Sequence, residues 1–171
     1  QKAPVLAETA AEVADIQVRN KGTIGGSLAH ADPAGDLPAA VLALEAEMTS
    51  GSSRAQRTSP IDRFFVDTFT TRPRGTGILT EIRVPNASPH TGQAYKKFAN
   101  KASHFAIVGV AAVVTIGQNG TCQTVRIGIT GAGPKAVRAR ASERILEGNE
   151  PTEARIERAA RAATPRGMQF L

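Results

Sequence analysis

The chain has 171 residues, of which 41% are hydrophobic and 4% aromatic, and its 21 basic and 15 acidic residues give a net charge of +6. A chain of this length buries roughly 68–70% of its unfolded surface and can fold unaided, while its single thiol, Cys122, excludes an internal disulfide and a four-cysteine iron–sulfur or zinc site. The basic residues are dispersed among acids, without an aromatic series on which bases could stack, and this argues against nucleic-acid binding.

The first part of the chain predicts two helices on either side of a glycine-rich loop. Residues 5–13 have a weakly helical pattern, and residues 22–26 form a loop suited to unusual backbone angles. Asp36 can cap a short amphipathic helix over residues 37–44, in which Pro38 lies in the tolerated first turn.

A small β structure with an aromatic core is expected next. Residues 47–58 read as a hairpin around residues 50–53. Three phenylalanines are expected to supply core packing: Phe64, Phe65 and Phe69. Residues 72–77 are expected to form a loop.

Residues 78–84 alternate as a strand that Pro85 ends. The alternation places Ile78, Ile82 and Val84 on one face. The other face holds Leu79 with two charged residues, Glu81 and Arg83, so Leu79 needs a covering surface.

A polar segment, residues 86–92, is the expected boundary between two lobes. The second lobe is predicted to hold antiparallel strands over residues 94–99, 105–116 and 121–130, with an Asn-Gly turn between the last two. Thr152 is expected to cap a helix over residues 153–163, and its Ile156 and alanines are expected to pack on the sheet. Arg126 and Thr130 are expected to be exposed or to meet a partner.

The residues most suited to binding chemistry lie in the glycine motif, residues 23–27. Adjacent glycines let successive N–H groups converge on an anion, and the missing side chains let a phosphate come close. A tight turn between packed elements is the simpler reading of two glycines alone.

Any redox centre must be a bound organic cofactor or lie on another chain. His30 lies close enough in sequence to contact a cofactor at the glycine motif, while the three histidines do not have the spacing of metal ligands.

Residues 18–38 resemble the FAD-binding subunit of the molybdenum hydroxylases, a family that includes xanthine dehydrogenase, carbon monoxide dehydrogenase and aldehyde-oxidising enzymes. The resemblance continues over most of the chain, through Phe64-Phe65, Thr70-Thr71, residues 79–85, residues 94–98, residues 108–111 and residues 143–148. It implies an α+β fold: the second subdomain of an FAD-binding domain of the p-cresol methylhydroxylase/vanillyl-alcohol oxidase type (residues 1–88), followed by the subunit's C-terminal domain, an antiparallel sheet packed with helices (residues 89–171).

The resemblance also assigns cofactor-binding residues. The FAD pyrophosphate would be held by the backbone of the glycine motif, formed by Thr23, Ile24, Gly25, Gly26 and Ser27. Asp36 would accept a hydrogen bond from a ribityl or ribose hydroxyl, and Leu79 would touch the flavin ring. Lys96 would lie near the flavin, where a cation stabilises the reduced anionic ring. Without the family, Lys96 and Lys97 would read as a solvated strand edge.

By the same resemblance the chain is an oxidoreductase subunit without a catalytic acid or base of its own. Its FAD would receive electrons from [2Fe–2S] clusters on a small subunit, after oxidation of substrate at a molybdenum cofactor on a large subunit. The family's first FAD subdomain, with a second glycine-rich loop, is expected to be missing. The alternative is therefore a truncated, non-catalytic relative that keeps the subunit-docking surface and binds no FAD alone.

A cytoplasmic location without membrane contact is expected. No apolar run approaches the ~18–20 residues of a membrane helix, and the first residues lack the apolar core of a signal peptide.

Overall fold

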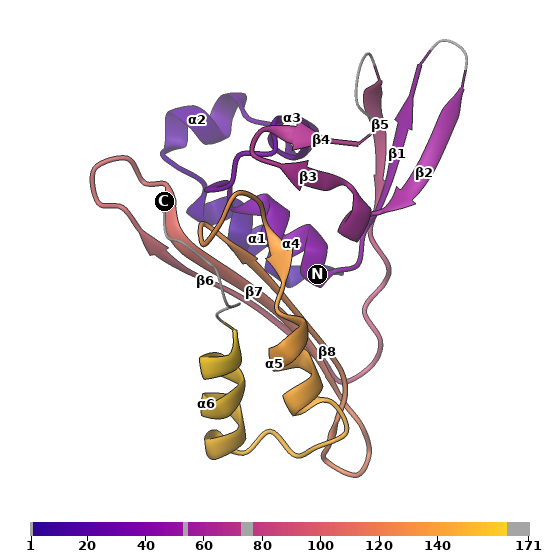
Figure 1. Ribbon diagram of the computed structural model, residues 1–171, viewed down its shortest axis with the longest axis vertical. Coiled ribbons are helices and arrows are strands. Elements are labelled where there is room, and N and C mark those ends of the chain that lie inside the picture. The colour runs from indigo at the N-terminus through magenta and orange to yellow at the C-terminus, as the bar shows by residue number, and fades with distance from the viewer. Residues whose placement is uncertain (1, 53–54, 73–76, 164–171) are drawn as a thin grey trace.

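A computed structural model describes residues 2–52, 55–72 and 77–163 of the chain (Figure 1). The helices are α1 (Pro4–Glu12), α2 (Ile16–Lys21), α3 (Ile24–His30), α4 (Leu37–Ala43), α5 (Arg140–Leu146) and α6 (Glu153–Ala162). The strands are β1 (Glu47–Gly51), β2 (Gln56–Pro60), β3 (Phe65–Asp67), β4 (Thr70–Thr71), β5 (Ile78–Arg83), β6 (Thr91–Ala99), β7 (Ala106–Ile116), β8 (Cys122–Thr130) and β9 (Val137–Arg138). The expected α+β class is confirmed, although α2, α3, α5, β3, β4 and β9 have no counterpart among the predicted elements.

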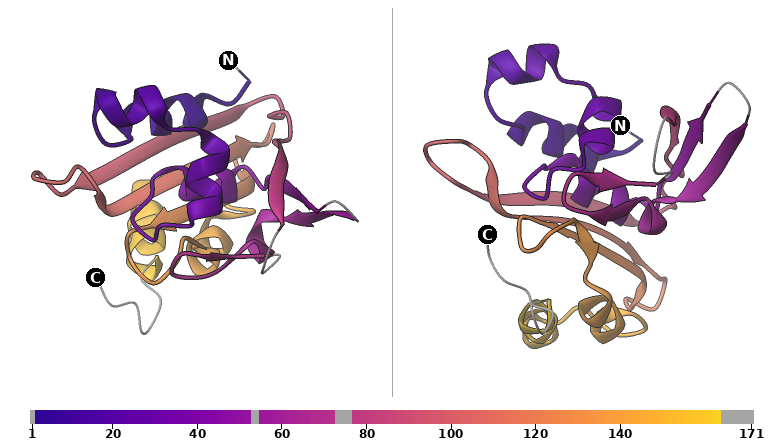
Figure 2. Two further views of the ribbon diagram at one scale, coloured as in Figure 1. Left: turned by 90° about the horizontal axis from the view of Figure 1, so that it is seen from above. Right: turned by 45° about the horizontal axis from the view of Figure 1, so that its top comes forward.

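The centre of the fold is an antiparallel sheet in the order β6-β7-β8-β9. Helices α1 and α4 cover one face of this sheet, and α5 and α6 lie beyond the other (Figures 1 and 2). The three long strands match the predicted ones, and the Asn-Gly turn holds Gly120 at a φ of 78°. A glycine favours that turn because a positive φ strains residues that have a Cβ.

Helix α4 packs with unusual closeness on β8. Every residue of α4 is buried. A Cβ built on Gly128 of β8 would lie 2.1 Å from the backbone oxygen of Ala39, so the glycine is what allows this contact. The loop that follows α3 ends directly before the first residue of α4. The packing of α4 on the sheet therefore fixes where that loop lies.

The smaller sheet, in the order β2-β1-β5, contains a β-bulge that overturns the predicted faces of β5. The register shifts between Thr49 and Ser50, which pair with Glu81 and Leu79. The extra residue in β5 breaks the strict alternation, so Leu79 packs against the same core as Ile82 and Val84. Ile78, which was expected in that core, is 70% exposed.

Other expectations were also wrong. Phe64 and Phe65 are buried as predicted, but Phe69 is exposed on the turn between β3 and β4. Ile156 is exposed because α6 packs mainly on α5 through residues such as Ala159, whose carbonyl accepts a hydrogen bond from the hydroxyl of Ser142. Thr130 is buried.

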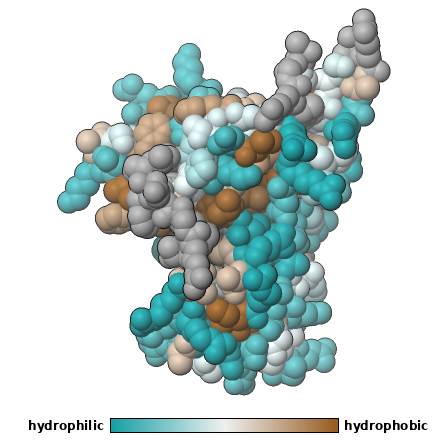
Figure 3. All heavy atoms as spheres, in the orientation of Figure 1, coloured by the Kyte–Doolittle hydropathy of each residue, from teal (hydrophilic) through white to brown (hydrophobic). Residues whose placement is uncertain are grey.

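The predicted hairpin over residues 47–58 is present as β1 and β2. Part of its turn, residues 53–54, and most of the predicted loop over residues 72–77 lie outside the described residues. Hydrophilic residues cover most of the face in Figure 3, and the hydrophobic areas on it are small and separate. Among the described helices, none has the length and apolar character needed to cross a bilayer.

Cys122 offers a simple test of this packing. Its side chain is buried, and burial raises the pKa of the thiol while nearby Arg155 lowers it less. We expect a thiol reagent to leave the native chain unlabelled and to label one site per chain in urea, as counted by intact mass spectrometry. Rapid labelling of the native chain would contradict the packing of β8.

Candidate functional site

The glycine motif, residues 23–27, is the start of helix α3. Thr23 is the residue before the helix, and its hydroxyl oxygen accepts a hydrogen bond from the N–H of Gly26 at 3.0 Å. The expected loop of unusual backbone angles is wrong, because Gly25 and Gly26 lie in the first helical turn. Helix geometry leaves the N–H groups of Ile24 and Gly25 without an intrahelical acceptor, at the positive end of the helix dipole.

The two glycines differ in the space around them. A Cβ on Gly26 would lie 2.9 Å from the Thr23 hydroxyl oxygen and would disturb the cap. A Cβ on Gly25 would meet no described atom within 4 Å. Bare backbone with outward N–H donors fits a phosphate, since an anion can approach it closely. The motif can therefore receive an anionic group such as a phosphate.

Asp36 lies at the end of the loop between α3 and α4, and its side chain is 5% exposed. Its carboxylate turns away from α4: Oδ1 accepts a hydrogen bond from Tyr95 Oη at 2.6 Å, and Oδ2 accepts one from Lys97 Nζ at 2.9 Å. The expected capping of α4 by this side chain is therefore wrong. Burial raises the pKa of Asp36, and the bonds from Tyr95 and Lys97 oppose that rise.

Leu79 and Lys96 lie in different places relative to the glycine motif. Helix α3 contacts β5, and Leu28 of α3 belongs to the core on which Leu79 packs. Leu79 therefore lies near the helix that the motif begins, and this core supplies part of the expected covering surface while leaving Leu79 half-buried. Lys96 is exposed on the face of β6 opposite Tyr95 and Lys97. The structure thus brings Leu79 to the motif and separates Lys96 from Asp36.

Lys97 is the polar residue that the sequence reading missed. Its side chain is 2% exposed, and Nζ also donates to the backbone oxygen of Glu12 at 2.8 Å. Two lysines in a row suggested a solvated edge. The burial of Lys97 could have been predicted from the period of two in a strand, because Lys97 lies on the same face as Tyr95, which is buried.

His30 ends helix α3 beside an aromatic side chain. Its ring centroid lies 4.9 Å from that of Phe69, and Nε2 is 3.8 Å from a carboxylate oxygen of Asp32. The residue after it, Ala31, has a φ of 53° and ends the helix. Within the described residues, no group of three or more histidine, cysteine, aspartate or glutamate side chains is placed to hold a metal ion.

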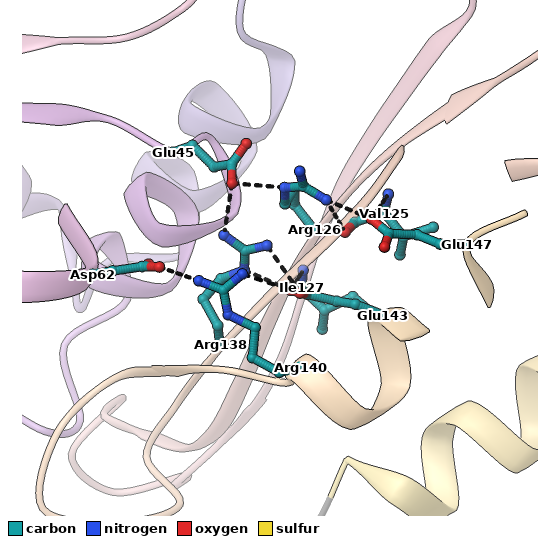
Figure 4. Close-up of polar contacts among 9 residues, drawn as sticks. All are labelled: Glu45, Asp62, Val125, Arg126, Ile127, Arg138, Arg140, Glu143 and Glu147. Carbon is teal, nitrogen blue, oxygen red and sulfur yellow. Dashed lines mark hydrogen bonds and ion pairs between the residues drawn. The ribbon is translucent and has the colours of Figure 1, made fainter. Parts of the chain in front are cut away.

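A network of ion pairs joins the segments that follow α4 and β2 to the C-terminal sheet and α5 (Figure 4). It consists of Glu45, Asp62, Arg126, Arg138, Arg140, Glu143 and Glu147. Glu45, directly after the α4 segment, lies 2.7 Å from Arg126 Nε and 3.2 Å from Arg138 Nη1. Although burial raises the pKa of Glu45, the bonds and charges of these two arginines bring it below its ordinary value. The expected exposure of Arg126 is therefore only partial, since Arg126 is paired within the chain.

The two parts of the chain match two known families in sequence. Residues 1–87 match the family described as "FAD binding domain in molybdopterin dehydrogenase", and residues 93–166 match "CO dehydrogenase flavoprotein C-terminal domain". The chain belongs to the FAD-binding medium-subunit family of the molybdenum hydroxylases.

Curated relatives in this medium-subunit family include the alpha subunit of the 6-hydroxypseudooxynicotine dehydrogenase complex of Paenarthrobacter nicotinovorans, 38% identical over 95% of this chain and 55% of that protein. Another is the carbon monoxide dehydrogenase medium chain of Hydrogenophaga pseudoflava, 39% identical over 94% of this chain and 55% of that protein. The chain thus spans about half the length of the curated relatives that it matches.

Solved structures of the family share the fold. A carbon monoxide dehydrogenase structure from Hydrogenophaga pseudoflava superimposes with a TM-score of 0.89 at 41% identity, covering 94% of this chain and 56% of that one. Quinoline 2-oxidoreductase from Pseudomonas putida 86 gives a TM-score of 0.86 at 30% identity, covering 99% of this chain and 58% of that one. These matches confirm the family and the fold class predicted from the sequence.

Proposed function

We propose that the chain is the FAD-binding part of an electron-transfer subunit in a cytoplasmic molybdenum hydroxylase complex. An iron–sulfur small subunit and a molybdopterin large subunit are its proposed partners. The names of its relatives support this proposal, since they are medium chains or subunits of dehydrogenase complexes. FAD, when bound, supplies a carrier that can take electrons from iron–sulfur clusters and pass them to an external acceptor.

The observation that carries the proposal is the start of helix α3. The N–H groups of Ile24 and Gly25 would hold the pyrophosphate, with Thr23 before them and Gly26 and Ser27 after them. Thr23 keeps the first turn in place through its bond to Gly26. Leu79 and Lys96 remain proposed flavin contacts by family resemblance. A contact with Leu79 requires the flavin to reach the exposed edge of β5.

The proposed division into domains follows the same resemblance. Residues 1–88 would be the C-terminal part of the FAD-binding domain, and residues 89–171 the C-terminal domain of the subunit. The packing of α1 and α4 on the sheet formed by β6, β7 and β8 makes these two parts interdependent in the folded chain. We therefore expect the full chain to be the smallest unit that is worth testing for cofactor.

A visible spectrum of the purified chain tests the proposal. After incubation with FAD and gel filtration, flavin absorbance should remain with the protein. A chain that emerges empty, yet still co-purifies with an iron–sulfur subunit, would favour the alternative of a non-catalytic relative.

Gly25→Asp should weaken FAD binding by at least 100-fold without weakening the fold. The added carboxylate meets open space in the described structure and is favourable in the first turn of a helix, but it repels the pyrophosphate. Isothermal titration with FAD measures the loss, and circular dichroism follows the thermal midpoint. Gly133→Asp is the matched control, because a Cβ there also meets no described atom within 4 Å. Equal FAD affinity of the Gly25→Asp chain and the unsubstituted chain would overturn the placement of the phosphate.

A further inference from the structure

The loop between α3 and α4, residues 31–36, is tied to the C-terminal sheet at two points. At the first point, the hydroxyl of Thr130 lies 2.8 and 2.7 Å from the backbone oxygens of Pro33 and Gly35, which share its single hydrogen, and the N–H of Gly131 donates to Pro33. At the second point, Tyr95 and Lys97 hold the carboxylate of Asp36. The loop that follows the glycine motif is therefore held by strands that lie far away in the sequence.

The second tie is enclosed and specific. Gly109 on the neighbouring strand leaves room for the tyrosine ring, since a Cβ there would lie 2.2 Å from Tyr95 Oη. The backbone N–H of Tyr95 donates to Glu8 of α1 at 2.9 Å, and Lys97 reaches the end of α1 at Glu12. Two charge-assisted bonds in such an enclosed place fix the position of a carboxylate far better than an exposed pair can.

The position of Asp36 is transmitted to the glycine motif through a short and tightly packed stretch of chain. Leu28 of α3 and Leu37 of α4 are both buried in one core cluster. The N–H of Gly35 bonds to the oxygen of Asp32, and a carboxylate oxygen of Asp32 accepts from the N–H of Ala34. A loop stiffened in this way moves as a unit, so displacing Asp36 also displaces the end of α3.

We propose that Tyr95 and Lys97 are positioning residues that hold Asp36, and with it the loop between α3 and α4, in the arrangement that receives FAD. The inference rests on the proposed function, because it takes the glycine motif as the phosphate site. It extends the cofactor site to the inner face of β6, whereas the family resemblance pointed to Lys96 on the outer face. Neither Tyr95 nor Lys97 is required to touch the cofactor.

Hydrogen exchange of the chain without cofactor tests the positioning directly. In Lys97→Met and Tyr95→Phe, amides of residues 31–36 should exchange at least tenfold faster, because one bond to a buried charged group is lost in each. Lys101→Met is the matched control, since it removes an exposed lysine from the loop after β6. FAD affinity measured in parallel should fall about tenfold or more in the first two variants and stay unchanged in the control.

A pH profile separates positioning from a general loss of packing. The charged and titratable groups around Asp36 are Tyr95 and Lys97 on β6 and Glu8 and Glu12 on α1. Without Lys97 the buried carboxylate is poorly compensated, so protonation relieves it and loop protection should recover as the pH falls from 8 to 5. Adding Asp36→Asn to Lys97→Met should remove this pH dependence.

The outcomes distinguish the inference from the proposed function. Unchanged loop protection in Lys97→Met and Tyr95→Phe overturns the positioning role, whether or not the chain binds FAD. Lost protection with unchanged FAD affinity also overturns it, because the loop would then not matter to the cofactor. Lost protection in a chain whose unsubstituted form retains no flavin supports the anchoring of the loop and counts against the proposed function instead.

Discussion

Arg138→Met is expected to lower the free energy of unfolding by about 3–5 kcal/mol, the cost of leaving one partner of a buried ion pair alone. The side chains of Arg138 and Glu143 are 3% and 4% exposed. Arg138 donates to both carboxylate oxygens of Glu143, at 2.5 and 2.9 Å, in the two-bond geometry that suits a guanidinium. Glu143 also accepts from the N–H of Ile127 at 2.9 Å, so the stranded carboxylate cannot leave without breaking the contact between α5 and β8.

Urea unfolding followed by circular dichroism measures this effect, and the same network supplies its control. Arg140 is 52% exposed and pairs with Asp62, and its only contact with Glu143 is a long one of 4.0 Å among the described residues, so Arg140→Met should cost no more than about 1 kcal/mol. Arg138→Met combined with Glu143→Gln should recover part of the loss, because glutamine still accepts from Ile127 but carries no charge. If Arg138→Met costs no more than Arg140→Met, the buried pair does not stabilise the fold.

The strands and helix α4 could be predicted because their patterns are local. A run of apolar, mostly β-branched and small residues marks residues 106–116, alternation with a period of two marks residues 122–130, and the Asn-Gly pair marks the turn between them. The same rule failed on β5 because one bulged residue reverses the alternation, and nothing in six residues reveals which partner strand imposes the bulge. Leu79 was consequently placed on the wrong face.

The position of the glycine motif could be predicted from the sequence, but its backbone conformation could not. Two adjacent glycines are poor helix formers, and this favoured a loop. The side chain of Thr23 provides the cap that compensates, and the preference of threonine for that position is the signal that was available.

The pairing of Asp36 with Tyr95 and Lys97 was beyond the reach of sequence patterns. Tyr95 and Lys97 lie about 60 residues after Asp36, at separations of 59 and 61, and meet it only because α4 packs on the sheet. A charged residue is expected at the surface unless it is paired, so each of these side chains reads as exposed until the fold supplies its partner.

Gly128→Ala is expected to be the most disruptive single-methyl change where α4 packs on β8, because the contact joins the backbone of Gly128 to the backbone of Ala39. The added Cβ would lie 2.1 Å from the oxygen and 2.9 Å from the carbonyl carbon of Ala39. No rotamer change can relieve that overlap, so α4 must move away from β8. Overpacking of this kind costs about 3 kcal/mol or more, and the shift would also strain the bonds from Thr130 to the loop between α3 and α4.

Thermal and urea unfolding of Gly128→Ala should therefore show a large loss, or the variant should fail to fold, whereas Gly92→Ala should change stability by less than about 0.5 kcal/mol. Gly92 is the matched control, since a Cβ there would lie 4.0 Å from its nearest described neighbour, the backbone oxygen of Val114. Ala39→Gly should not rescue Gly128→Ala, because the closest atoms at Ala39 are its carbonyl oxygen and carbon. Rescue by that substitution would mean that side chains, rather than backbone, set the distance between α4 and the sheet.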